Sequence, residues 1–261
     1  MDKKGILNRQ YIKELSGYIS DPDIKNISVS GLYASAKSFA LSSTVTSGIH
    51  IVILHKREEA AGFINDLYNL IGEDNVFFFP PSKDFSTKVQ RTAAIGAVVD
   101  YKKGVSPHPY IVLVGYKESF DEGVLEEKLL KKSIISIKVG DHISHEFFKE
   151  VLFDSAFTKA DFVSQPGEFA IRGSLIDVFS YGDSHPYRID FFGDEIESIK
   201  IFNANTQRSE KEVNSLDIYP NITSSSESEF TVPVLEFLPQ ESVVWVGDTD
   251  KPERYLSDHK H

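Results

Sequence analysis

The sequence contains no cysteine. Disulfide bonds, thiolate ligands for metals and cysteine nucleophiles are therefore excluded together. Positive charge is also in short supply, because 28 Lys and Arg stand against 39 Asp and Glu and give a formal net charge of −11. Proteins that bind nucleic acid through its phosphates rely on clustered Lys and Arg. We therefore expect this chain to bind DNA directly little or not at all.

Long apolar runs are missing as well. No run approaches the length of a membrane-spanning helix, and the charged segment MDKKGILNRQYIKEL lacks the apolar stretch of a signal peptide. These two absences favour a cytoplasmic location. The 261 residues, of which 41% are hydrophobic, are enough to build a buried core in one large domain or in two smaller ones.

The first part of the chain, residues 1–118, alternates apolar strand patterns with helical ones. Short apolar strands separated by amphipathic helices indicate a parallel sheet that is covered on both faces. We therefore expect an α/β domain here. Its strands are predicted over 26–29, 48–54, 75–79 and 110–114, and its helices over 7–19, 60–71 and 88–101.

Closely spaced strand patterns follow over residues 119–208 and predict a small inserted α+β domain with an antiparallel meander. The expected elements are strands at 133–140, 168–179, 187–192 and 196–203 and a helix at 143–153. Residues 209–261 contain a serine-rich linker or loop, NITSSSESEF, and the apolar strand SVVWVG. We expect this last segment to return to the α/β domain and to complete it.

The segment GLYASAKS places Gly31, Lys37 and Ser38 at the spacing of a phosphate-binding loop, G-x-x-x-x-G-K-[ST]. Ala36 stands where that motif needs its second glycine, and its β-carbon would crowd the backbone N–H groups that curl around phosphate. No acidic residue follows directly after the strand at 110–114 to hold magnesium. We therefore expect a vestigial nucleotide loop, with no cofactor and no ATPase activity.

The sequence offers no clear catalytic group. His142 and His145 have a spacing that lets two side chains share a helical face, but zinc needs a third ligand and usually a fourth. A solvated pair is the preferred interpretation. No G-x-S-x-G elbow occurs, and no grouping of Ser, His and Asp stands out. We expect no metal and no catalytic residues, and therefore a chain that is not an enzyme.

The segment PYRIDFFGDE puts Arg188, Asp190 and Phe192 at alternate positions of a predicted strand. Successive side chains of a strand point to opposite faces. These three residues should therefore share one face, and Ile189 should lie on the other, inward face. The apolar set can line a core, whereas a phenylalanine on the charged side has no such use.

Arg172 joins this charged face if the predicted strand at 168–179 pairs with it in a symmetric hairpin register. Two arginines and a phenylalanine on a rigid sheet resemble a binding hot spot, but single exposed aromatic residues are also common on solvated surfaces. From the residues alone, protein binding and an ordinary surface stay equally open. Solvent-facing positions should also contribute little to folding, which would apply to Arg172, Arg188 and Phe192.

The segments QPGEFAIRGSLIDVF, PYRIDFFGDEIESIKIF and TQRS closely resemble the motif shared by the bacterial excision-repair helicase UvrB and the transcription-repair coupling factor Mfd. An α/β domain interrupted by a small α+β domain is also similar to the amino-terminal module of that family. UvrB-like proteins have an intact phosphate loop and a tyrosine-rich hairpin that clamps damaged DNA. The missing loop glycine and the short, aromatic-poor segment PPSKDFSTK therefore favour Mfd.

The resemblance implies a degenerate RecA-like α/β domain and an inserted domain that binds UvrA. Carried over by motif position, the UvrA contacts are Arg172, Arg188 and Phe192. The chain would then be a non-catalytic module that recruits UvrA in transcription-coupled nucleotide excision repair. It would be an amino-terminal fragment of an ATP-dependent DNA translocase, whose other domains would be further partners. The alternative is a nucleotide-dependent, damaged-DNA-binding module of the UvrB type.

Overall fold

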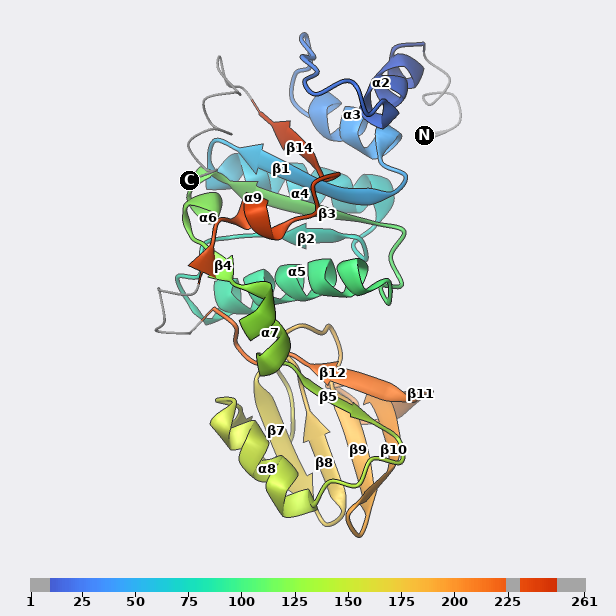
Figure 1. The fold of residues 1–261 in the computed structure, drawn as a ribbon, viewed down its shortest axis with the longest axis vertical. Helices are drawn as coiled ribbons and strands as arrows, with labels where there is room; N and C mark the ends of the chain where they lie inside the picture. The colour runs from blue at the N-terminus through green and yellow to red at the C-terminus, as the bar shows by residue number, and fades with distance from the viewer. Residues whose placement is uncertain (1–9, 224–230, 248–261) are drawn as a thin grey trace. The chain divides into compact units, whose positions relative to one another are not determined.

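The computed structural model describes residues 10–223 and 231–247 and divides into two compact units (Figure 1). Most of the expected serine-rich linker, 224–230, lies outside the described residues. The domain boundaries expected from the sequence, after residues 118 and 208, remain a proposal about domain organisation. Of the described residues, 10–81, 97–122 and 233–247 belong to the first unit, and 82–96, 123–223 and 231–232 belong to the second.

A four-stranded parallel sheet forms the centre of the first unit, in the order β14-β1-β3-β2. Six of the seven residues in β1 and in β3 are buried. Their apolar, β-branched sequences favour this burial, because both faces of the sheet are covered. The strands predicted at 48–54 and 110–114 are confirmed. The bounds are β1 (Gly48–Leu54), β2 (Val76–Phe78), β3 (Tyr110–Tyr116) and β14 (Val243–Val246).

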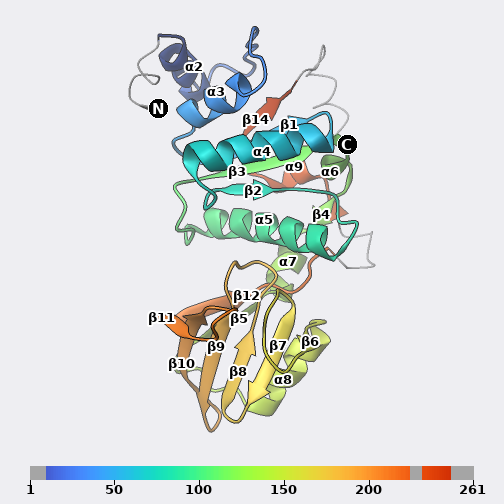
Figure 2. The same ribbon diagram turned by 180° about the vertical axis from the view of Figure 1, so that it is seen from behind.

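Helices pack on both faces of this sheet. Figure 2 shows α4 crossing β1 and β3, and Figure 1 shows the short helix α9 on the opposite face. Ala60, Ile64 and Leu67 of α4 are buried at the spacing of one helical face. None of the described helices is long and apolar enough to span a bilayer. The bounds are α2 (Gln10–Ser20), α3 (Ala36–Thr44), α4 (Arg57–Ile71), α6 (Lys117–Asp121) and α9 (Val234–Phe237), and α5 (Phe85–Lys103) contributes residues to both units.

A six-stranded sheet dominates the second unit, in the order β11-β10-β9-β8-β7-β6, and every neighbouring pair except β6 and β7 is antiparallel. Its strands are β6 (Thr158–Lys159), β7 (Glu168–Arg172), β8 (Leu175–Val178), β9 (Tyr187–Phe192), β10 (Glu195–Phe202) and β11 (Ser209–Val213). The unit also contains the strand pairs β4 (Val124–Leu125) with β13 (Thr231–Val232) and β5 (Ile135–Lys138) with β12 (Ser215–Ile218), and the helices α7 (Glu127–Ser133) and α8 (His145–Asp154).

Helix α8 covers one face of the six-stranded sheet (Figure 1). Phe148 and Leu152 of α8 are buried in one core with Ile176 of β8 and Ile189 of β9. The alternation of apolar residues along β8 and β9 sends these isoleucines to the same side of the sheet. The opposite face carries polar side chains from β7, β8 and β9.

The predicted fold class is confirmed, since a parallel α/β sheet is combined with an α+β unit built on an antiparallel meander. Two predicted elements are wrong. Residues 26–29 form no strand, because they are exposed and no described strand lies beside them to pair their backbone groups. The segment 168–179 is not one strand but two. A turn at Gly173, whose φ of +62° glycine adopts without steric strain, separates β7 from β8.

A buried histidine links β1 to β14 in the first unit. The Trp245 Nε1–H donates to His50 Nδ1 at 3.1 Å, and His50 Nε2 lies 3.1 Å from the carbonyl oxygen of Ser47. This arrangement suits the neutral ring with its proton on Nε2. Burial lowers the pKa of His50 below its ordinary value of 6.5, although the bond to Ser47 acts in the opposite direction. The pairing of β14 with β1 is therefore coupled to the protonation of one imidazole.

We predict that the first unit loses stability as the pH falls below about 6.5, the ordinary value from which the pKa of His50 is lowered. The unfolded chain takes up the proton more readily than the folded chain, so the contribution of His50 is complete above that pH and is lost as the pH falls toward and through the lower folded-state pKa. Urea unfolding followed by the fluorescence of Trp245, the single tryptophan, measures this directly. His50→Gln can still accept from Trp245 but does not titrate. An equal decline in both proteins between pH 7.5 and 5.5 would contradict the prediction.

Candidate protein-binding face

The alternation predicted for β9 is confirmed. Ile189 and Phe191 are buried against the α8 side, whereas Arg188 and Asp190 are half-buried on the other side. Phe192 ends the strand with 77% of its surface exposed. The charged segment therefore lies on the face of the sheet that α8 does not cover. We call this surface the open face.

Arg172 also lies on the open face, although its strand does not pair with β9 as predicted. Strand β8 runs between β7 and β9, so Arg172 pairs with Leu175 and does not face β9 directly. Asp177 of β8 lies opposite Arg188 of β9. The side chains of both arginines reach this aspartate, which places them on the same side of the sheet.

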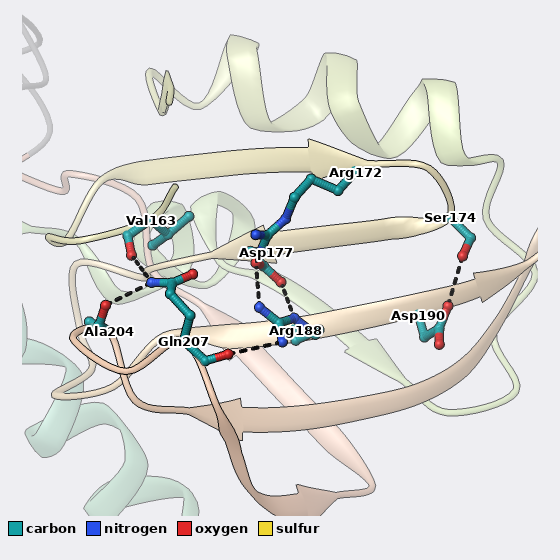
Figure 3. A network of polar contacts seen from close by, with 8 residues as sticks. All are labelled: Val163, Arg172, Ser174, Asp177, Arg188, Asp190, Ala204 and Gln207. Carbon is teal, nitrogen blue, oxygen red and sulfur yellow. Dashed lines mark hydrogen bonds and ion pairs between the residues drawn. The ribbon is translucent and has the colours of Figure 1, made fainter. Parts of the chain in front are cut away.

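Asp177 is the centre of the polar network drawn in Figure 3. Arg188 donates to it from Nε and Nη2, at 2.7 and 2.9 Å, in the bidentate geometry that a guanidinium and a carboxylate favour. Arg172 donates to the same carboxylate from its Nη2. The Asp177 side chain is only 1% exposed. Two guanidinium groups therefore compensate one buried negative charge.

The burial of Asp177 makes these pairs part of the fold as well as part of the surface. An ionised carboxylate is costly to bury unless it is paired and hydrogen-bonded. Arg188 is itself only 17% exposed, whereas Arg172 is 33% exposed. Hydrogen bonding to Asp177 raises the pKa of Arg188 above its ordinary value, so Arg188 stays charged. The expectation that both arginines are simply solvent-facing is wrong for Arg188.

Aromatic rings and a glutamine fix the positions of the guanidinium groups further. Arg188 stacks over the buried ring of Phe202 at 4.6 Å, and Arg172 lies 5.1 Å from the ring centre of Phe162. Arg188 Nη1 also donates to the backbone oxygen of Gln207 at 3.3 Å. Gln207 is one of three non-glycine residues that the described chain holds at positive φ. Each guanidinium is thus held from two or more sides.

At the end of the open face near the turn from β9 to β10, the polar contacts are fewer than around Asp177. Ser174, in the turn after β7, donates from Oγ to Asp190 at 3.0 Å (Figure 3). Phe192 follows two residues later, just before Gly193 and the turn into β10. Among the described residues, no aromatic ring or cation packs against the ring of Phe192, and its exposure leaves most of its apolar surface in water. The ring of Phe192 therefore contributes little to the packing of the fold, and packing does not explain why an aromatic residue lies on the charged side.

Sequence reasoning missed Asp177 and Phe162. A signal for Asp177 was present, since an acidic residue inside the apolar run LIDVF demands a positively charged partner. Phe162 lies in the loop between β6 and β7, and nothing in the sequence ties it to Arg172. Its contact depends on how that loop folds across the sheet.

The expected nucleotide loop lies in the first unit, apart from this network. Gly31 has a positive φ, and α3 begins at Ala36 with Lys37 in its first turn. The Ser38 side chain is buried, and its Oγ donates to Asp66 Oδ2 of α4 at 2.9 Å. In a functional loop this hydroxyl would hold magnesium. Here it stabilises the packing of two helices.

The two histidines of the expected pair do not share a helix. His142 precedes α8 and forms an isolated β-bridge with Glu195, whereas His145 is the first residue of α8, behind the cap residue Ser144. The ring of His145 meets Phe191 edge-on at 5.3 Å. The two side chains therefore do not share a helical face; His142 is exposed and His145 is half-buried. Among the residues that the structure describes, no three potential ligands gather to hold a metal ion.

The second unit, which carries the open face, contains a segment that matches a known protein family. The model of the UvrB interaction domain family matches residues 135–223. This segment is therefore similar to UvrB interaction domains. It contains the whole network around Asp177, from Phe162 to Gln207. The matched family is an interaction domain, so the segment is an interaction module and not a catalytic domain.

Relatives extend the similarity beyond this domain. The transcription-repair-coupling factor of Bacillus subtilis is 27% identical over 76% of the chain and 17% of its own length, and that of Staphylococcus haemolyticus is 27% identical over 83% and 18%. The Escherichia coli factor is 32% identical over 42% of the chain and 10% of its own length. The chain thus spans less than a fifth of each of these relatives. The predicted resemblance to the UvrB-homology module of transcription-repair-coupling factor is confirmed.

We predict that Arg188→Ala destabilises the second unit by about 1–3 kcal/mol, because it removes two hydrogen bonds from a buried carboxylate. Arg172→Ala should cost less, since the bidentate pair between Arg188 and Asp177 remains. Chemical denaturation followed by circular dichroism measures both variants. Equal stability of Arg188→Ala and the wild-type protein would show that the fold does not depend on this pair.

Proposed function

We propose that this chain recruits UvrA as a non-catalytic module of a transcription-coupled nucleotide excision repair factor that acts in the cytoplasm. The match to the UvrB interaction domain and the names of the relatives support this proposal. The motif segments that resemble UvrB and Mfd support it as well, since they include Arg172, Arg188 and Phe192. We infer that the longer parent protein is an ATP-dependent DNA translocase, whose other domains are further partners.

The observation that carries the proposal is the composition of the open face. A largely exposed phenylalanine shares this face with two arginines whose positions are fixed by Asp177. Aromatic residues and arginine are enriched in the residues that dominate binding energy. Guanidinium groups that are held in place before binding lose less conformational freedom when a partner arrives. The face therefore has both the residue types and the rigidity of a binding surface.

We predict that Phe192→Ala weakens UvrA binding about 30-fold or more while leaving the melting temperature nearly unchanged. The ring is exposed in the free chain, so its loss removes an intermolecular contact and little of the core. Titration calorimetry with purified UvrA measures the affinity. Ile189→Ala is the contrasting variant, because Ile189 is fully buried and its truncation should lower the melting temperature. If Phe192→Ala binds UvrA like the wild-type chain, Phe192 is only a solvated residue.

We also propose that the loop containing Gly31, Lys37 and Ser38 is a vestigial nucleotide site. A working loop follows a strand and leaves its Ser or Thr hydroxyl available to magnesium. Here residues 26–29 form no strand, and the hydroxyl of Ser38 donates to Asp66. These observations support the interaction module over the UvrB-type alternative.

We predict that calorimetric titration of the chain with Mg·ATP shows no binding at micromolar concentrations. Ala36 crowds the loop, and the strand at 110–114 is followed by no acid that could hold magnesium. A saturating isotherm with ATP would favour the nucleotide-dependent alternative.

We also predict that a gel shift with duplex or damaged DNA at low salt shows no discrete complex, because the net charge of the chain is −11.

A further inference from the structure

We propose that Phe162 is a second aromatic contact of the UvrA-binding surface and acts together with Arg172. This inference rests on the proposed function and extends its site to the loop between β6 and β7. Phe162 is 60% exposed, yet it does not lie apart from the charged network. The guanidinium of Arg172 lies over its ring at 5.1 Å. An exposed ring and a partly exposed guanidinium therefore form one composite surface.

The backbone beside Phe162 is firmly anchored. The neighbouring residue, Val163, is fully buried with Phe179 and Phe202 beneath the loop. The backbone oxygen of Val163 accepts from Gln207 Nε2 at 3.0 Å (Figure 3). Gln207 in turn accepts from Arg188 through its own backbone oxygen. The loop is thereby tied to the same network that positions the arginines.

The two arginines differ in how many donors they spend inside the chain. Arg188 uses Nε and Nη2 on Asp177 and Nη1 on Gln207. Arg172 makes one hydrogen bond among the described residues, from Nη2 to Asp177. A guanidinium has five N–H donors, so Arg172 keeps most of them for a partner.

The chemistry of the matching partner surface follows from this difference. Asp177 is one carboxylate between two guanidinium groups, so the network holds one positive charge that Asp177 does not neutralise. A carboxylate of UvrA is the group that completes this site, through charge-assisted hydrogen bonds to Arg172. The ring of Phe162 lies beside that position and suits an apolar side chain next to the acidic one. Phe162 thus sets specificity for an acidic residue with an apolar neighbour.

The chain offers a matched control on the other side of the sheet. Phe147 lies on α8, which packs on the opposite face, and it is 59% exposed. A loss of binding that came only from removing an exposed phenylalanine would appear equally in Phe147→Ala and Phe162→Ala. A loss confined to Phe162→Ala locates the contact on the open face.

The experiment measures the affinity of purified UvrA for Phe162→Ala, Phe162→Leu, Phe147→Ala and Phe192→Ala, together with the melting temperature of each variant. We expect Phe162→Ala to weaken binding about tenfold and Phe147→Ala less than twofold. Phe162→Leu keeps an apolar side chain but loses the ring beneath Arg172. Its affinity for UvrA should therefore lie between those of the wild-type chain and Phe162→Ala. It also replaces Phe162→Ala as the decisive variant if the alanine protein melts near the assay temperature. In an Arg172→Ala background, Phe162→Ala should cost less than it does alone, because the two side chains act as a unit.

The outcomes separate this inference from the proposed function. If Phe192→Ala weakens UvrA binding but the Phe162 variants bind like the wild-type chain, the role of Phe162 is overturned and UvrA recruitment stands. If the wild-type chain does not bind UvrA, the proposed function fails, and the role of Phe162 fails with it. If Phe162→Ala costs the same with and without Arg172, the composite contact is overturned.

Discussion

A buried carboxylate fixes the arrangement of the open face of the second unit. Asp177 lies in β8, near the middle of the six-stranded sheet, with almost no access to water. A negative charge in that position would cost several kcal/mol if it were unpaired. Arg188 from β9 and Arg172 from β7 provide the compensation, so three neighbouring strands are joined by one charge. The positions of the two guanidinium groups follow from this requirement of the fold.

This arrangement gives the arginines and the exposed aromatic residues different roles. The arginines pair with the buried carboxylate. In the proposed interface, their removal would therefore affect folding and binding together. The exposed ring of Phe192 has no comparable duty inside the chain. Loss of binding in an arginine variant is therefore ambiguous until stability is measured, whereas loss of binding in the phenylalanine variant reports on the surface itself. In the proposed interface, the rigidity supplied by Asp177 would also lower the entropic cost of association.

The sequence predicts the elements whose burial pattern is regular and local. Strand β9 alternates without interruption, and its two faces could be assigned from Arg188 and Ile189 alone. The division of 168–179 was missed although Gly173 and Ser174 are a sequence signal for a two-residue turn between two short strand patterns. Arg172 still lies on the predicted face. Strand β8 separates β7 from β9, and its Asp177 pairs with Arg172 on one side and with Arg188 on the other. The contact with Phe162 depends on a loop that lies across the sheet, and local periodicity carries no information about it.

In the first unit, the segment proposed as a vestigial nucleotide loop takes part in helix packing. Ser38 lies at the position where a hydroxyl would hold magnesium, but its bond to Asp66 fixes α3 against α4. Ala36, at the position where a phosphate-binding loop needs glycine, is the first residue of α3. The hydroxyl then contributes more as a buried link between helices than as a solvated group. In the second unit, by contrast, a buried charge keeps two guanidinium groups ordered on the open face.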